Sequence, residues 1–196
     1  MREIALHLLD IAENSVAAQA QNITITVCED LDRDRLCAII QDDGAGMNAE
    51  TLARVTDPFV TSRTTRKVGL GIPLLKAAAE ACDGYLQMDS QPGKGTSLDV
   101  SFQRSHIDRM PLGDLPGTLL TLVVAYPHIN WEFRYQVCCS SGDPASPQGH
   151  EFFFDSRPIK ETLEGISFSE PEVLAFIRKN LEDGVAGVQR ALPEFA

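Results

Sequence analysis

Polar side chains form a stripe along the first predicted helix, over residues 3–20. His7, Asp10 and Asn14 recur at spacings of three and four residues, which places them on one helical face. A face that only meets water is more commonly built from Lys and Glu, because Asp and Asn have lower helix propensity. The stripe therefore marks Asp10 and Asn14 as candidate functional residues, with His7 in a structural or supporting role.

Three short glycine-rich segments follow along the chain. None is a complete phosphate-binding motif by itself: the second lacks the third glycine of a dinucleotide fingerprint, and the third has Gly after its Lys, so it is not a P-loop. Each segment alone is more typical of a turn, but their order and spacing within one domain are more specific. The segments are Asp42-Asp43-Gly44-Ala45-Gly46-Met47, Gly69-Leu70-Gly71-Ile72 and Gly93-Lys94-Gly95-Thr96.

In this order the segments resemble the boxes of the ATPase superfamily shared by gyrase, the Hsp90 chaperones, histidine kinases and MutL. Ala12-Glu13-Asn14-Ser15 is similar to its N box, and Asp42-x-Gly44-x-Gly46 to its first glycine box. Asp57-Pro58-Phe59 and the segment at Gly69 look most like the histidine-kinase version of the later boxes, and the segment at Gly93 looks like the last box. The resemblance covers about residues 3 to 104.

The resemblance implies that the chain binds ATP and Mg²⁺. Asp42 ends a predicted strand, and its carboxylate would accept a hydrogen bond from the adenine amino group. Gly44, Gly46 and Met47 would lie beside the base, which glycine allows to approach closely. Asn14 would ligate Mg²⁺, which prefers oxygen ligands and usually keeps waters and substrate phosphates.

The later boxes would bind the phosphates, because their glycines open a predicted helix whose free N–H groups suit an anion. Two basic residues just before it would neutralise the γ-phosphate charge, although they are equally consistent with solvated loop charges. A threonine in the last box would hydrogen-bond near the base. These residues are Arg66, Lys67, Gly69, Leu70, Gly71, Ile72 and Thr96.

Asp10 lies one helical turn before Asn14 on the same face. In relatives that hydrolyse ATP a Glu at this place orients water as a general base, whereas the residue here is the shorter Asp. Asp10 is therefore a candidate catalytic residue for one of two roles. It would support hydrolysis, or it would orient a protein hydroxyl or imidazole for phosphoryl transfer.

The hydrophobic pattern predicts an α+β fold. Predicted strands at 23–28, 36–40, 85–89 and 96–102 alternate with helices at 3–20, 48–54 and 72–82. This order favours antiparallel pairing with the helices on one face. The resemblance implies a two-layer α/β sandwich, the Bergerat ATP-binding fold, with a mixed but mostly antiparallel sheet.

A segment rich in Pro, Gly and charge, residues 105–117, predicts a boundary between an ATP-binding domain (1–104) and a small α+β module (105–196). The module contains predicted strands at 131–137 and 151–155 and a helix at 171–181 that ends before Asp183-Gly184. Residues 119–126 fit a helix better than a buried strand. Three aromatic residues of the first strand are either its core or a partner surface: Trp131, Phe133 and Tyr135.

Composition limits the class of protein. The chain has 196 residues, 43% hydrophobic and 23% charged, typical of a soluble globular protein. A net charge of -11 argues against nucleic acid or an anionic membrane surface as a partner. The longest apolar run is too short to span a membrane. Five cysteines without a C-x-x-C pair argue against a disulfide framework or zinc site, so we expect a cytoplasmic protein.

The first helix starts almost at Met1, so this sequence has no room for the upstream helical hairpin that carries the phosphoacceptor histidine of histidine kinases. Phosphorylation in cis is therefore not expected. The leading hypothesis is an Mg²⁺-ATP-dependent kinase or regulator that acts on a separate, unidentified partner protein. A nucleotide-dependent binding switch and a slow ATPase are the alternatives, and the oligomeric state is left open.

Overall fold

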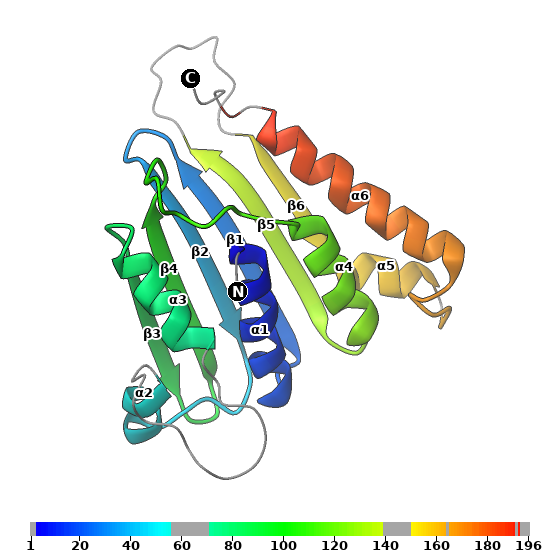
Figure 1. Cartoon of the computed structure of the whole chain (residues 1–196). Coiled ribbons are helices and arrows are strands. Elements are labelled where there is room, and N and C mark those ends of the chain that lie inside the picture. The colour runs from blue at the N-terminus through cyan, green and yellow to red at the C-terminus, as the bar shows by residue number, and fades with distance from the viewer. Residues whose placement is uncertain (1–2, 56–70, 139–149, 164, 191, 193–196) are drawn as a thin grey trace.

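A computed structural model describes residues 3–55, 71–138, 150–163, 165–190 and 192. These residues form one mixed six-stranded sheet in the order β3-β4-β2-β1-β5-β6, with the helices on one face (Figure 1). The fold is α+β, as predicted. The strands are β1 (Asn22–Asp30), β2 (Arg35–Asp42), β3 (Tyr85–Gln91), β4 (Gly95–Gln103), β5 (Asn130–Cys138) and β6 (Glu151–Asp155). The helices are α1 (Ile4–Ala17), α2 (Ala49–Val55), α3 (Gly71–Glu80), α4 (Leu115–Ala125), α5 (Ser156–Leu163) and α6 (Pro171–Gln189).

The strands bury one face because successive side chains of a strand point to opposite sides of the sheet. In β1, Ile23, Ile25 and Val27 are buried and the residues between them are partly exposed. β1 pairs antiparallel with β2, β2 with β4, and β3 with β4, as the expected antiparallel pairing of these strands has it. β5 instead pairs with β1 in parallel, and β6 returns antiparallel to β5.

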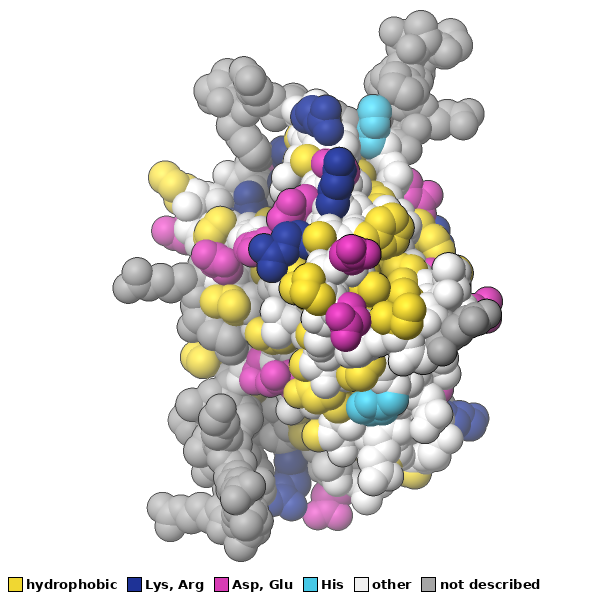
Figure 2. All heavy atoms as spheres, turned by 90° about the vertical axis from the view of Figure 1, so that its right-hand side faces the viewer, with side chains coloured by type: hydrophobic (Ala, Val, Ile, Leu, Met, Phe, Trp, Pro, Cys, Tyr) yellow, Lys and Arg dark blue, Asp and Glu magenta, His cyan; other side chains and the backbone are white. Residues whose placement is uncertain are grey.

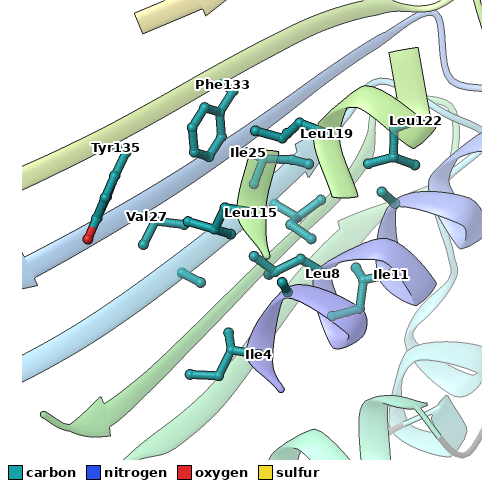
Figure 3. Close-up of a cluster of buried hydrophobic side chains, with 14 of the residues drawn as sticks. Ile4, Leu8, Ile11, Ile25, Val27, Leu115, Leu119, Leu122, Phe133 and Tyr135 are labelled. Carbon is teal, nitrogen blue, oxygen red and sulfur yellow. The ribbon is translucent and has the colours of Figure 1, made fainter. Parts of the chain in front are cut away.

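The core lies between the sheet and a layer made mainly by α1 and α4 (Figure 3). Leu8 of α1 and Leu122 of α4 are at most 1% exposed, and they face Ile25 and Phe133 of the sheet. Full burial of one such side chain stabilises the fold by about 1.5–3 kcal/mol. The core therefore joins residues from both sides of the predicted boundary near residue 105.

The residues after 105 contain the expected strands and helices, but these continue the first sheet instead of forming a sheet of their own. β5 runs beside β1 over nine residues, from the Asn22–Asn130 pair to the Asp30–Cys138 pair. Trp131 and Phe133 of β5 are at most 2% exposed, which confirms that these aromatic residues belong to the core. Sheet and core are continuous across residues 104 and 105, and the division of the chain into two domains there stays a prediction.

After residue 105, two helices differ from the expected bounds and one was missed. α4 begins at Leu115, where Gly117 N donates to Asp114 Oδ1 at 2.9 Å, so the helical interpretation of this segment is confirmed. α6 continues to Gln189, so the predicted end near Gly184 is wrong. A Cβ on Gly184 would lie 2.2 Å from the Phe152 ring, so this glycine allows helix and strand to pack closely rather than ending the helix. α5 was not predicted.

The side of the molecule on which α5 and α6 lie carries an exposed hydrophobic area. Figure 2 shows hydrophobic side chains gathered in the middle of this face, among acidic and basic ones. Phe176 of α6 is 61% exposed, and Phe153 of β6 is 48% exposed. None of the helices in the described part of the chain has the length and apolar character to cross a membrane.

Candidate functional site

The carboxylate of Asp42, the last residue of β2, is held from two sides. Ser15 Oγ of α1 donates a hydrogen bond of 2.6 Å to Oδ2, and Gly44 N donates one of 2.9 Å to Oδ1. A carboxylate has about four acceptor positions, so both oxygens can accept a further donor. Asp42 is therefore oriented by the protein and still able to recognise an amino group.

The glycine-rich loop after β2 lies between the end of α1 and the β3–β4 turn. Ala45 N donates to Ala18 O at 2.8 Å, and Gly93 N donates to Ala45 O at 2.7 Å. Gly46 has a φ of +64°, and a Cβ there would lie 2.0 Å from Gln91 O. Glycine at this position is thus required by the contact with the β3–β4 turn, independently of any ligand.

Ser90 ties the loop to the last glycine box. Its hydroxyl accepts from Met47 N at 2.8 Å and donates to Gly95 O at 3.0 Å. Thr96 Oγ1 lies 2.9 Å from Ser90 Oγ. Because the single hydroxyl proton of Ser90 goes to the carbonyl, Thr96 is the donor of this pair and keeps its lone pairs free to accept. Ser90, through its hydrogen bonds to Met47 and Gly95, fixes Thr96 beside the loop.

The first turn of α3 packs directly against the polar stripe of α1. α3 begins at Gly71, and a Cβ on Gly71 would lie 1.8 Å from Asp10 Oδ2. The Asp10 carboxylate thus lies against the Gly71 backbone, at the end of the helix where free N–H groups favour an anion. Asn14 follows one turn later on α1 and is exposed.

His7, the first residue of the stripe, is buried at 2% exposure. Burial lowers the pKa of its imidazole, as does the charge of the N-terminus, while Asp10 and a hydrogen bond with the Gly71 backbone raise it in part. The result is a lowered pKa, so His7 is neutral at pH 7. Nδ1 has no hydrogen-bond partner among the described residues. His7 therefore supports the contact between α1 and α3, in line with its predicted role.

The structure brings most of the predicted site residues to one end of the sheet, although Ile72 is a core residue, 9% exposed. Arg66, Lys67, Gly69 and Leu70, with the Asp57-Pro58-Phe59 segment, lie outside the described residues.

Sequence reasoning missed Ser15 and Ser90. Ser15 adjoins the N-box Asn14, and this adjacency was the only signal that could have indicated its role. The residues brought together are Asp10, Asn14, Asp42, Gly44, Gly46, Met47, Gly71 and Thr96.

Comparison with known proteins gives relatives for the first half of the chain. It is 32% identical over 117 residues to the non-motile and phage-resistance protein of Caulobacter vibrioides, covering 55% of this chain and 14% of that protein. It is 26% identical over 96 residues to sporulation kinase A of Bacillus subtilis, covering 49% and 16%. The chain thus spans less than a fifth of either relative.

The fold has a counterpart in solved structures over nearly the whole chain. The N-terminal domain of a DNA repair protein matches with a TM-score of 0.53 and 10% identity, covering 96% of this chain and 57% of that one. At this identity the match concerns the fold alone. A family model described as histidine kinase-, DNA gyrase B-, and HSP90-like ATPase matches residues 1–106, more than half of the chain. The chain therefore belongs to this family of ATPase domains, and its first half is a histidine kinase-like ATPase domain.

Proposed function

We propose that this protein binds Mg²⁺-ATP through Asp42, Asn14 and the first turn of α3, and uses it to phosphorylate a separate partner protein. ATP binding is implied by the family, whose model spans residues 1–106. The magnesium ion, the phosphoryl transfer and the partner protein go beyond what the family implies. The arrangement of the described residues supports them.

One observation carries the proposal: a short stretch of α1 contacts both halves of the site. At one end of the stretch the Asp10 carboxylate lies against Gly71, the first residue of α3. At its other end Ser15 donates to Asp42 at 2.6 Å. A nucleotide whose base lies at Asp42 and whose phosphates lie at α3 would therefore extend along this stretch, past the exposed side chain of Asn14.

The donor set fits a magnesium-bound triphosphate. Asn14 offers an exposed amide oxygen, and Mg²⁺ needs few protein ligands when phosphates and waters supply the rest. The bound ion would neutralise phosphate charge. Asp10, at the phosphate end, would accept the proton of an incoming hydroxyl or hold an imidazole in line. Asp42 would select a base that presents an amino group, because a carboxylate only accepts.

A partner protein is supported by the C-terminal half of the chain. Hydrophobic side chains gather on the face where α5 and α6 lie (Figure 2), and Phe176 of α6 is 61% exposed. Isolated exposed apolar residues are normal, but areas of this kind on soluble proteins often mark interaction sites. The partner contact would then lie in the segment that the family model does not match.

A nucleotide-dependent switch is the second candidate, and a hydrogen-bond chain favours it. Asn22 Nδ2 donates to Asp43 Oδ2 at 2.6 Å, Asn130 Nδ2 donates to Asn22 Oδ1 at 2.9 Å, and Lys160 Nζ donates to Asn130 Oδ1 at 3.0 Å. These hydrogen bonds lead from Asp43, the residue beside Asp42, to Asn130 of β5 and Lys160 of α5. Nucleotide binding would alter the C-terminal surface through it, with slow turnover or none.

The two candidates differ in where the γ-phosphate goes. Incubation of the full chain with γ-labelled ATP, Mg²⁺ and fractionated lysate of the source organism should transfer label to another protein. Asn14→Ala should abolish the transfer, whereas Thr121→Ala in α4, outside the site, should leave it intact. Partner-independent release of phosphate would favour a plain ATPase instead. Nucleotide-dependent binding without label transfer would favour the switch.

A further inference from the structure

Three cysteines lie on the face of the sheet opposite the helices. Cys28 of β1 and Cys37 of β2 are register partners, and Cys138 is the last residue of β5. All three are partly exposed, and the helices of Figure 1 cover the other face. This face therefore presents thiols to solvent. No group of three His, Cys, Asp or Glu residues among those described is arranged to hold a metal ion.

Cys28 and Cys138 are in contact. Their Sγ atoms lie 3.3 Å apart, although the residues are 110 positions apart in the sequence. In the parallel ladder Cys28 pairs with Gln136 and Asp30 pairs with Cys138, so the thiols are diagonal neighbours on one face. The end of β5 is held in place because Leu31 N donates to Cys138 O at 2.9 Å.

Cys37 does not share this contact, although it lies opposite Cys28. Its Sγ donates to Ser101 Oγ of β4 at 3.5 Å, on the side of β2 away from β5. Cys82 is buried in the turn that follows α3. Of the described thiols, only the Cys28–Cys138 pair therefore has two sulfur atoms in contact.

We propose that Cys28 and Cys138 form an oxidation site, at which a small-molecule disulfide converts the two thiols reversibly into an intramolecular disulfide. The Cys138 thiolate attacks the oxidant, and one oxidant thiol leaves. Cys28 then loses its proton and attacks the mixed disulfide, which releases the second thiol. One S–S bond forms, one breaks, and the two electrons reduce the oxidant to two thiols.

The order of the two attacks follows from the surroundings of Cys28. Burial, and then the hydrogen bond with Cys138, raise the pKa of Cys28 to about 12. Only the thiolate is a nucleophile, so Cys28 is a poor first attacker. It reacts well only when a mixed disulfide is already in contact with it. Cys138, which is partly exposed and in contact with Cys28, is therefore the first attacker, and Cys28 resolves the mixed disulfide.

The bond would join β1, inside the family-matched region, to β5 beyond it. Closing a long loop restricts the unfolded chain, so the oxidised form should unfold at a higher temperature. The nucleotide site lies at the opposite end of β1, where Asn22 contacts Asp43. Oxidation should therefore change stability without changing nucleotide affinity, and this inference does not depend on the proposed function.

The test uses the full reduced chain, treated with oxidised glutathione, alkylated and digested without reduction. We expect a Cys28–Cys138 peptide pair and an intact mass lower by about 2 Da, for the two hydrogens lost. The melting temperature should rise by about 5 °C or more and return on reduction. Cys28→Ser and Cys138→Ser should both abolish the link and the rise, whereas Cys37→Ser should keep them.

Two results would overturn the proposal. One is a link between other residues, such as Cys138 with Cys139 or Cys28 with Cys37. The other is free thiols at both positions after treatment with excess oxidised glutathione. Because the peptide map is read on the wild-type chain, it decides the matter even if a serine variant fails to fold.

Discussion

The Ser15 hydroxyl donates a 2.6 Å hydrogen bond to Asp42 Oδ2, and this contact joins the N-box helix to the carboxylate that ends β2. Ser15 is 4% exposed, so the bond is shielded from water on the α1 side. The neighbouring Asn14 is exposed. In the proposed site, Ser15 orients the Asp42 carboxylate and the neighbouring Asn14 would ligate Mg²⁺.

Ser15→Ala should weaken binding of a non-hydrolysable ATP analogue by about tenfold, because a hydrogen bond to a charged group contributes about 1.5 kcal/mol or more. Titration calorimetry measures the change. Thr121→Ala is the control, since it removes a hydroxyl that bonds to Gly117 O within α4, far along the chain from the site. Unchanged affinity in Ser15→Ala would mean that Asp42 is oriented without this bond.

Gly71→Ala should reduce phosphoryl transfer or turnover at least tenfold with little loss of stability. The added Cβ would meet the end of the Asp10 side chain at 1.8 Å. A flexible carboxylate can swing away, so the fold survives but Asp10 leaves its place. Gly187→Ala in α6, where nothing lies within 4 Å of the new methyl group, should be neutral or slightly stabilising.

A double-mutant comparison isolates the cause of the Gly71 effect. In an Asp10→Ala background, Gly71→Ala should have little further effect on the rate, because the displaced group is already absent. Additive losses in the double variant would instead place the damage in α3 itself.

The Asp43 carboxylate should make the free energy of unfolding depend on pH. Burial raises the pKa of this carboxyl, but hydrogen bonds from Asn22 and Gln21 lower it more, and the net pKa is below its usual value. A group with a depressed folded-state pKa stabilises the fold above its unfolded value, near 4, and loses this contribution as pH falls through the folded value. Because Asp43 is exposed and solvent screens its hydrogen bonds, Asp43→Ala should cost less than about 1 kcal/mol at pH 7.

The stability difference between Asp43→Ala and wild type should shrink as the pH falls below about 4. Urea unfolding at several pH values measures it. Thr121→Ala, which removes no ionisable group, should show no such pH-dependent difference. A constant difference for Asp43→Ala down to pH 2 would show that its hydrogen bonds do not depend on ionisation.

A buried polar cluster links the family-matched region to β5. Glu29 accepts from Arg104 Nε at 2.6 Å and from the Tyr135 hydroxyl at 2.6 Å, and the ion pair is less than 10% exposed. Glu29→Ala should cost about 3–5 kcal/mol, since it leaves a buried cation without its carboxylate. Tyr135→Phe should cost about 1.5–3 kcal/mol, because it removes the hydroxyl that donates to Glu29 but leaves the ion pair in place. Equal losses in chemical denaturation would contradict this ranking.

The sequence predicted the helices and strands that carry the site better than it predicted which elements pair or pack with one another. Alternation in β1 and the position of Asp42 at a strand end follow from local patterns, and the structure agrees. The parallel pairing of β5 with β1 was not predicted, because hydrophobic periodicity shows that a strand is buried but not which strand lies beside it. A separate module after residue 105 was expected for the same reason.

The missed site residues were missed because their roles depend on distant partners. Ser15 lies on the apolar stripe of α1, and its acceptor Asp42 is 27 residues away. Ser90 lies in β3, and it bonds to Met47, 43 residues away. Gly184 was taken for a helix end because its packing partner, Phe152, lies in another element. In each case the residue type alone fits a more common local role.

The most direct test of Mg²⁺-ATP binding at Asp42 is calorimetric titration with a non-hydrolysable ATP analogue, with and without Mg²⁺, on wild type and Asp42→Asn. We predict that wild type binds, that Mg²⁺ strengthens binding, and that Asp42→Asn loses it. Asparagine presents an amide donor and no charge where the carboxylate only accepts. No binding by wild type, or equal binding by Asp42→Asn, would contradict the assignment of Asp42 as the residue that recognises the base.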